Sequence, residues 1–181
     1  MSRIQERIEV EAPVTTVYNQ WTQFESFPQF MEGVERVVQL DDTTLDWTAS
    51  IGGQRRRWQA RITDQVPDQR IRWESMAGAR NDGMVAFEPQ GPGRTRVDLV
   101  VDVEPEGPVE SAGDALGVVK ARVAGDLRRF KDFIEGRGVE TGGWRGTIDR
   151  GAVVSPDPAA APETGLPGTP EPGGLTGIRG R

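Results

Sequence analysis

The side chains that could carry out chemistry in this chain are few, because it contains no histidine and no cysteine. This excludes the commonest general base near neutral pH, thiolate nucleophiles, disulfides and the Ser-His-Asp or Cys-His catalytic groups. A zinc or iron site would have to use carboxylates alone, which is uncommon, so we predict no metal and no cofactor. Proton transfer would fall to Tyr18, the only tyrosine, to Arg56, or to a buried carboxylic acid with a raised pKa.

A second group of residues is apolar and could bind a ligand. Trp47, Trp58 and Trp73 share the inward-facing parity of three neighbouring predicted strands. Four residues of short helical segments are expected to close the mouth of a pocket there: Phe24, Phe27, Phe30 and Met31. Ligand pockets also hold a few placed polar groups, for which the candidates are Tyr18, Gln54, Arg56 and Asn81. Arg56 either meets an anionic or carbonyl-bearing end of the ligand or lies beyond the sheet rim in solvent.

The elements that would position these residues follow from hydrophobic periodicity. Alternation of apolar and polar side chains predicts seven strands, at residues 4–11, 34–40, 43–51, 54–66, 69–76, 83–88 and 94–103. Clean alternation over consecutive hairpins indicates an antiparallel sheet with one packed face and one wet face. Between the first two strands, a short helix is predicted at 13–22 and a second helical turn at about 24–31.

A long amphipathic helix over about 108–136 is predicted to cover the packed face, with a curved sheet wrapped around it. Its apolar residues fall at steps of three and four, at Val109, Ala112, Leu116, Val119, Val123, Leu127, Phe130 and Ile134. The first half of the helix is rich in Ala and Gly, and the second half is bulky. We therefore expect a ligand cavity between the thin half and the three tryptophans, lined also by Leu116 and Val119. The alternative is that the three indoles fill that space themselves.

The composition places a domain boundary near residue 136. Residues 1–136 form the predicted α+β domain, and residues 137–181 form a tail rich in Gly and Pro that is expected to be mostly disordered, from about residue 150 onward. The segment 142–148 differs, because it carries Trp144 and Ile148. It either docks on the domain or on a protein partner, or leaves Trp144 exposed without a role.

The net charge of −6 and the pI of about 4.9 argue against nucleic acid as a partner. Without a predicted membrane span or a signal-peptide core, we expect a cytoplasmic protein. One local basic group, on the wet face of the sheet, comprises Arg55, Arg57, Arg61, Arg70 and Arg72. It is either a solvated face with cross-strand partners such as Asp46 and Glu74, or a surface for transient contact with an anionic membrane.

The order of these elements resembles the helix-grip fold of the START-like superfamily, and several segments resemble its bacterial polyketide cyclase/dehydrase and coenzyme-Q-binding-like branch. The resemblance covers the domain and not the far tail. It is carried by Val10-Glu11-Ala12-Pro13, Phe24-Glu25-Ser26-Phe27-Pro28-Gln29-Phe30-Met31, Trp58-Gln59-Ala60-Arg61-Ile62, Ile71-Arg72-Trp73 and Gly125-Asp126-Leu127. It implies a pocket for a hydrophobic ligand such as a lipid, an isoprenoid quinone or an aromatic polyketide.

Three functions stay open at this point. The first is a carrier or sensor that binds the ligand without transforming it. The second is a cyclase/dehydrase-type enzyme, for which Tyr18 and Arg56 are the only candidates and no inward pair of carboxylates is visible. The third is a stress-related interaction protein with a vestigial pocket, supported by the tail and Trp144. One scaffold can host all three, so the fold alone does not choose among them.

Overall fold

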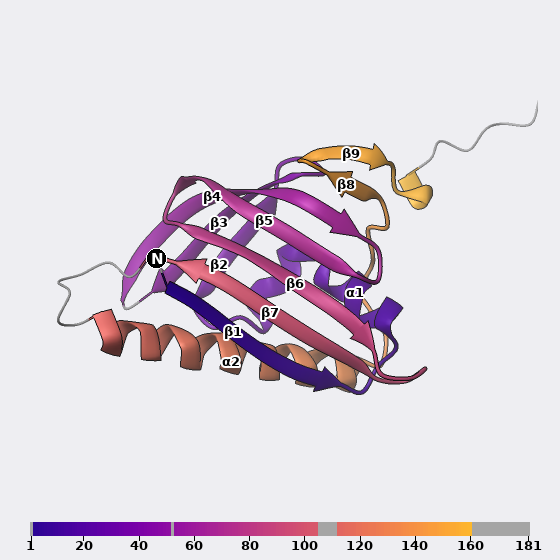
Figure 1. Cartoon of the computed structure of the whole chain (residues 1–181), viewed down its shortest axis with the longest axis horizontal. Coiled ribbons are helices and arrows are strands. Elements are labelled where there is room, and N and C mark those ends of the chain that lie inside the picture. Colours follow the sequence, from indigo (N-terminus) through magenta and orange to yellow (C-terminus); the bar gives the residue numbers. More distant parts are fainter. Residues whose placement is uncertain (1, 52, 105–111, 161–181) are drawn as a thin grey trace, which may run out of the picture.

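The computed structural model describes residues 2–51, 53–104 and 112–160, without the side chains of Ile51 and of residues 112–114 (Figure 1). The element order is strand, two short helices, six strands, long helix and a C-terminal hairpin. The bounds are β1 Ser2–Val10, α1 Val14–Trp21, η1 Phe24–Gln29, β2 Val34–Gln39, β3 Thr44–Ile51, β4 Gln54–Val66, β5 Arg70–Gly78, β6 Asn81–Pro89, β7 Thr95–Val103, α2 Ala112–Arg137, β8 Thr147–Asp149, β9 Ala152–Ser155 and η3 Pro158–Ala160.

The strands form one antiparallel sheet in the order β1-β7-β6-β5-β4-β3-β2, with β8 pairing β4 and β9. The α+β helix-grip architecture is confirmed, but the predicted count of seven strands is wrong, because the sheet has nine. The reason lies in unequal strand lengths. The pairing of β3 with β4 ends where Thr44 lies opposite Arg61, and β4 continues for five residues beyond Arg61. β8 pairs with this extension of β4 at Asp64 and Gln65.

The extra strands come from the segment whose composition predicted disorder. Regular structure continues past residue 150, through β9 and η3. The expected onset of disorder at about residue 150 is thus corrected for residues 150–160, because β9 pairs with β8 and η3 follows it. Residues 161–181, the rest of the predicted tail, lie outside the described residues.

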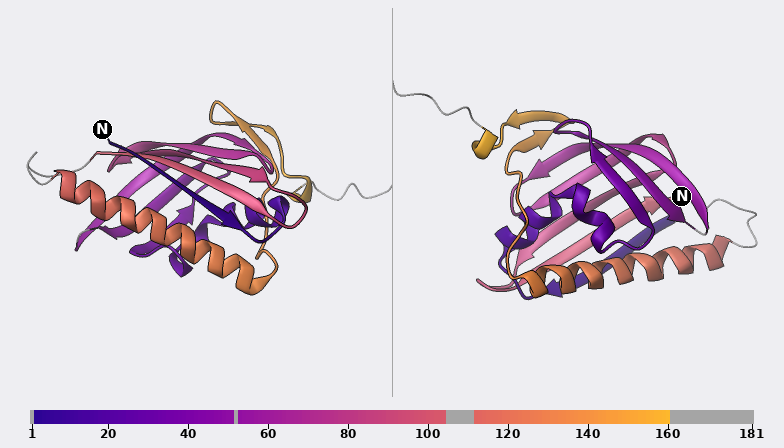
Figure 2. Two further views of the ribbon diagram at one scale, coloured as in Figure 1. Left: turned by 60° about the horizontal axis from the view of Figure 1, so that its bottom comes forward. Right: turned by 180° about the vertical axis from the view of Figure 1, so that it is seen from behind.

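The long helix α2 lies across the concave face of the sheet, as its periodicity predicts (Figure 2). Leu127, Phe130 and Ile134, in its bulky half, are at most 2% exposed and belong to the main hydrophobic core. α1 and η1 lie beside this half of α2 and add Val17, Trp21 and the phenylalanines of η1 to the same core. The fold therefore packs tightly at one end of α2.

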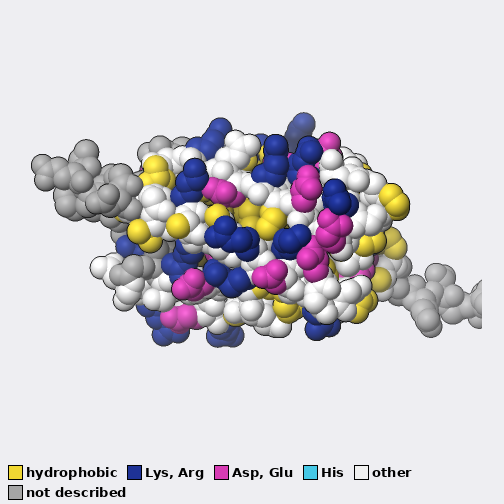
Figure 3. Space-filling model, turned by 90° about the horizontal axis from the view of Figure 1, so that it is seen from below, with side chains coloured by type: hydrophobic (Ala, Val, Ile, Leu, Met, Phe, Trp, Pro, Cys, Tyr) yellow, Lys and Arg dark blue, Asp and Glu magenta, His cyan; other side chains and the backbone are white. Residues whose placement is uncertain are grey.

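Charged side chains cover the outer surface in mixed signs. On the wet face of the sheet, Arg57 pairs with Asp46 at 2.8 Å, Arg55 pairs with Glu35 at 2.8 Å, and Arg70 pairs with Asp64. Seen from the side of α2, Lys and Arg again alternate with Asp and Glu around small groups of hydrophobic side chains (Figure 3). No helix in the described part of the chain combines the length and the apolar character needed to cross a bilayer.

Candidate functional site

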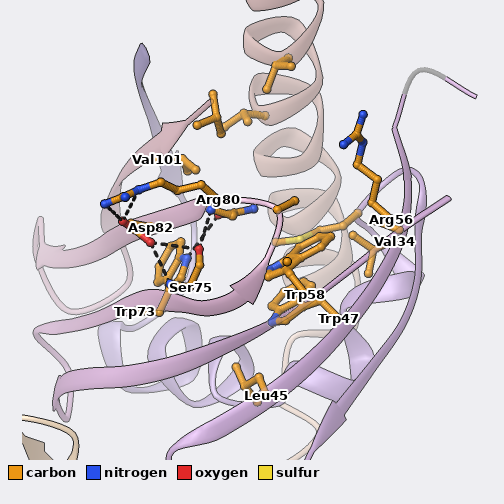
Figure 4. Close-up of a pocket in the computed structure, with 18 of the residues that line it drawn as sticks. Val34, Leu45, Trp47, Arg56, Trp58, Trp73, Ser75, Arg80, Asp82 and Val101 are labelled. Carbon is orange, nitrogen blue, oxygen red and sulfur yellow. Dashed lines mark hydrogen bonds and ion pairs between the residues drawn. The ribbon is translucent and has the colours of Figure 1, made fainter. Parts of the chain in front are cut away.

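A cavity of about 1240 Å³ lies between the sheet and the first half of α2 (Figure 4). Its wall is mostly apolar and draws on the three tryptophans, on η1 and on α2. Eight of the nine predicted ligand-binding residues line it: Trp47, Trp58, Trp73, Phe24, Phe27, Met31, Leu116 and Val119. The cavity lies at the thin end of α2, where the sequence placed it, and the three indoles form part of its wall.

The two ends of the cavity differ in exposure. Trp21, Phe24 and Phe27 are 2–6% exposed and form a closed aromatic end through edge-to-face contacts. Met76 of β5 and Val118 of α2 also belong to the wall but are 50% and 67% exposed, so they mark the open side.

The structure corrects two expectations about the phenylalanines. Those of η1 were expected to close the mouth, whereas they form the closed end, because η1 lies against the bulky half of α2. Phe30 does not belong to the wall at all. Its ring packs on Phe130 at 5.3 Å and on Phe133 at 5.2 Å, so it is a core residue.

The tryptophans form two parts of the wall. Trp47 and Trp58 lie directly opposite each other on β3 and β4, and their rings stack at 5.7 Å with an interplanar angle of 7°. Trp73 of β5 is held separately, with its Nε1–H donating to Asn81 Oδ1 at 3.4 Å. The stacked pair offers a flat aromatic surface, against which apolar or planar groups of a ligand can pack.

Polar groups gather toward the open side. Ser75 donates from its backbone N–H and from Oγ to Asp82 Oδ1, at 2.8 and 3.0 Å, while Arg80 pairs with Asp82 Oδ2 at 2.9 Å. Arg56 is half-buried in the wall and donates to Gln54 Oε1 at 3.2 Å. Arg56 therefore belongs to the cavity wall, on its polar side.

Asp126 is a wall residue that sequence reasoning missed, because a charged side chain does not belong to the apolar stripe that defines the packed face of the helix. Its Oδ1 accepts the backbone N–H of Glu32 at 2.8 Å and a hydrogen bond from Arg129. Burial raises the pKa of this carboxyl in spite of those bonds. The signal was available, since Val119, Val123 and Asp126 follow at steps of four and three and share one helix face.

Two arginines of α2 tie the helix to the segment between η1 and β2. Arg122 donates to the carbonyls of Glu32 and Ser50 at 2.8 and 2.9 Å, and Arg129 donates to the Phe30 carbonyl at 2.9 Å. Gly33 makes room for Arg122, because a Cβ there would lie 1.6 Å from Nη2. These bonds join α2 to the β2–β3 side of the cavity.

Tyr18, a candidate for proton transfer, does not line the cavity. It is fully buried in α1, its ring packs edge-on against Phe87, and its hydroxyl accepts a hydrogen bond from Gln65 Nε2 at 2.8 Å. Burial is the main cause that raises its pKa to about 12, with the bond from Gln65 acting in the opposite direction. The structure therefore places Tyr18 in the core and not among the residues that line the cavity.

The raised pKa of Tyr18 predicts a loss of stability in alkali. The phenol ionises near its ordinary pKa of 10.0 in the unfolded chain and near 12 in the folded one. The stability that the neutral phenol contributes is therefore complete below pH 10. It is lost as the pH rises toward 12, which lowers the free energy of unfolding by about 2–3 kcal/mol. Urea unfolding at pH 9 and pH 11.5 should show a larger fall for the wild type than for Tyr18→Phe. Equal falls would contradict this assignment.

Gly83 of β6 is the close neighbour that lets Trp73 lie in the wall. A Cβ at this position would lie 2.3 Å from Trp73 Cζ2 and 2.7 Å from the Val100 carbonyl oxygen. Gly83→Ala should displace the indole, lower the free energy of unfolding by about 1–3 kcal/mol and change the tryptophan emission. Gly93→Ala is the matched control, because no atom lies within 4 Å of a Cβ there. Two variants of equal stability would refute the prediction.

The described residues hold no cluster of three or more His, Cys, Asp or Glu side chains placed for a metal ion. The wall thus offers apolar and aromatic surface, a polar network at the open side, and the half-buried carboxyl of Asp126 with a raised pKa. These groups suit the binding of an amphipathic or apolar molecule.

Comparison with known proteins extends this description. Residues 10–132 match a family model described as polyketide cyclase/dehydrase and lipid transport. An uncharacterized 17.2 kDa protein from the melC2-rnhH intergenic region of Streptomyces lincolnensis is 50% identical over 149 residues, which cover 82% of this chain and 99% of that protein.

Solved structures share the fold at low sequence identity. A START superfamily protein from Mycobacterium smegmatis has a TM-score of 0.60 and 21% identity, covering 75% of this chain and 95% of its own. The Zhui aromatase/cyclase from Streptomyces sp. R1128 has a TM-score of 0.65 and 17% identity, covering 78% and 98%. At these identities the similarity shows a common fold and does not by itself carry over an activity.

Proposed function

Since this chain belongs to the polyketide cyclase/dehydrase and lipid transport family, we propose that it binds a hydrophobic small molecule in the cavity between the sheet and α2. The ligand would be a lipid, an isoprenoid quinone or an aromatic polyketide-like compound, and the protein would act as its carrier or sensor. The observation that carries the proposal is the cavity of about 1240 Å³ with its closed aromatic end.

The size of the cavity supports binding over a vestigial pocket. An open cavity of this size leaves a large apolar surface in contact with water, which is unfavourable unless a ligand covers it. The volume here exceeds the roughly 300–1,000 Å³ of ordinary ligand pockets. A wall of tryptophan, phenylalanine and aliphatic side chains offers little to hydrogen-bond water, so an apolar ligand would gain the burial of its own surface there.

Native mass spectrometry of the gently purified protein, with organic extraction of whatever dissociates, tests the proposal. We expect a defined apolar adduct that is lost in Trp58→Asp, because that substitution puts a charge on the buried face of the wall. A ligand should also raise the melting temperature by mass action. A protein that stays at its apo mass and shows no thermal shift after incubation with lipid, quinone and polyketide extracts would overturn the proposal.

Asp126 favours a second candidate function, that of a cyclase-type enzyme. Burial in the cavity wall raises the pKa of this carboxyl, and a carboxyl with a raised pKa is a candidate for giving or taking a proton. On this hypothesis Asp126→Asn would bind the ligand normally and would not convert it, as judged by mass spectrometry of the extracted ligand. Identical ligand recovered from the wild type and from Asp126→Asn would leave the carrier function.

A further inference from the structure

The segment after α2, residues 138–155, crosses α1 and continues into β8 and β9; we call it the strap (Figure 2). Ile148 of the strap is fully buried and pairs with Gln65 of β4, and Trp144 is half-buried against the main core. The family match ends at residue 132, inside α2, so the strap lies beyond the matched fold. Its contacts are additional to those that define the family domain.

Arg145 anchors the strap. Its Nη1 and Nη2 donate to the two carboxylate oxygens of Asp68 at 2.9 and 2.8 Å, and Nη1 also donates to Asn19 Oδ1 at 2.9 Å. The guanidinium lies 5.6 Å from the ring centre of Tyr18. Bidentate pairs of this kind are geometrically specific. The hydrogen bonds from Arg145 hold the pKa of Asp68 below its ordinary value, so the pair stays charged at neutral pH.

Gln20 of α1 connects the strap to η1. Its side-chain amide is fully buried and forms hydrogen bonds both to the strap and to η1. Its Oε1 accepts the Thr141 backbone N–H at 2.8 Å, and its Nε2 donates to Thr141 Oγ1 at 3.1 Å and to Ser26 Oγ at 3.2 Å. Ser26 lies in η1 between Phe24 and Phe27, which line the cavity. Displacing the strap would leave this buried amide without two of these three bonds.

A second link lies at the end of α1. The backbone N–H of Trp144 donates to Thr22 Oγ1 at 2.9 Å, and that hydroxyl donates to the carbonyl of Asn19 at 2.6 Å. The strap therefore bonds to the residues on both sides of Trp21. The indole of Trp21 lines the cavity and meets Phe130 at 4.8 Å.

We propose that the strap is a positioning element of the ligand site, which holds α1 and η1 so that Trp21, Phe24 and Phe27 form the closed end of the cavity. Its hydrogen bonds reach the chain neighbours of these wall residues, at Gln20 and Thr22 and, through Gln20, at Ser26, so Arg145 and Thr141 are positioning residues. The inference rests on the proposed function only where ligand binding serves as a readout. The geometry of α1 and η1 can be followed without any ligand.

The first test compares Arg145→Ala with Arg150→Ala in the full chain. Arg150 lies on the same strap, but its side chain is 92% exposed, so it is a matched control. At a temperature where far-UV circular dichroism shows native structure, we expect Arg145→Ala to speed amide hydrogen exchange in residues 14–30 and to weaken cis-parinaric acid binding about tenfold. Arg150→Ala should change neither. Wild-type exchange in Arg145→Ala would overturn the proposal.

An engineered disulfide between the strap and α1 distinguishes a positioning role of the strap from a general loss of stability. The chain has no cysteine, and a Cβ built at Gly143 lies 3.0 Å from Asn19 Cβ, slightly closer than the roughly 3.5–4.5 Å of a disulfide. In Asn19→Cys/Gly143→Cys/Arg145→Ala, oxidation should restore slow exchange in residues 14–30 and tight probe binding, and reduction should remove both. Equal behaviour of the two redox forms would refute the proposal.

These readouts also distinguish the two proposals. If the wild type binds neither cis-parinaric acid nor any extracted ligand, the proposed function fails, and the hydrogen exchange of α1 and η1 still decides the role of the strap. If the wild type binds the probe and the strap variants bind it equally well with unchanged exchange, only the strap proposal fails.

Discussion

Replacing Leu116 and Val119 together by tryptophan should weaken cis-parinaric acid binding at least tenfold without lowering the melting temperature. Both residues line the cavity from the thin half of α2. They are three positions apart and lie on the same face of the helix, so the two introduced indoles would enter the same space. A ligand would have to displace them, and a tenfold loss corresponds to about 1.4 kcal/mol. The fold should tolerate them, because they extend into the cavity and meet an apolar wall.

Ala121→Trp is the control for this prediction. Ala121 lies on the same helix but is exposed and does not belong to the cavity wall, so its indole would project into solvent. Fluorescence titration of the three proteins measures the affinity, and thermal unfolding measures the stability. Wild-type affinity in the double variant, or an equal loss in Ala121→Trp, would show that the probe binds elsewhere.

Truncating the bulky half of α2 should cost far more stability than truncating its thin half. Phe130 is fully buried, with its ring 4.8 Å from Trp21 and 5.3 Å from Phe30, so Phe130→Ala removes packed contacts and leaves a void, at about 3–5 kcal/mol. Val119 is half-buried and faces the cavity already, so Val119→Ala should cost less than about 1 kcal/mol.

Urea unfolding of the two variants at neutral pH checks this contrast, with the denaturant dependence compared to confirm that both unfold as the wild type does. A similar cost for both substitutions would mean that the thin half of α2 packs as closely as the bulky half. That result would contradict the division of the helix on which the ligand site depends.

The asymmetry of α2 is also the clearest case of a feature that could be predicted from the sequence. The predicted apolar stripe carries Ala112, Leu116 and Val119 in the first half of the helix and Leu127, Phe130 and Ile134 in the second, so the bulkiest side chains were expected to pack at one end. The tryptophans were predictable for a similar reason. Residues two apart in a strand share a face, so Trp47, Trp58 and Trp73 were placed on the wall by local alternation.

The errors concern contacts between elements that are distant along the chain. Periodicity shows that Phe30 and Tyr18 are buried, but it does not show whether they face the cavity or the core, since both surroundings are apolar or enclosed. That choice depends on which end of α2 lies against α1 and η1. For the same reason the closed end was mistaken for the mouth.

By itself, the sequence determined the strands and helices up to the end of α2, the antiparallel sheet, the covering helix and the apolar character of the site, because each depends on a local period of two or 3.6 residues. Only the tertiary structure decided the position of the strap. Its segment is rich in glycine and has no period of its own. It is ordered because β4 extends beyond the end of β3 and pairs with β8, and because half-buried Asp68 and buried Gln20 offer partners to Arg145 and Thr141. Such partners lie tens of residues away in sequence and become neighbours only when the chain has folded.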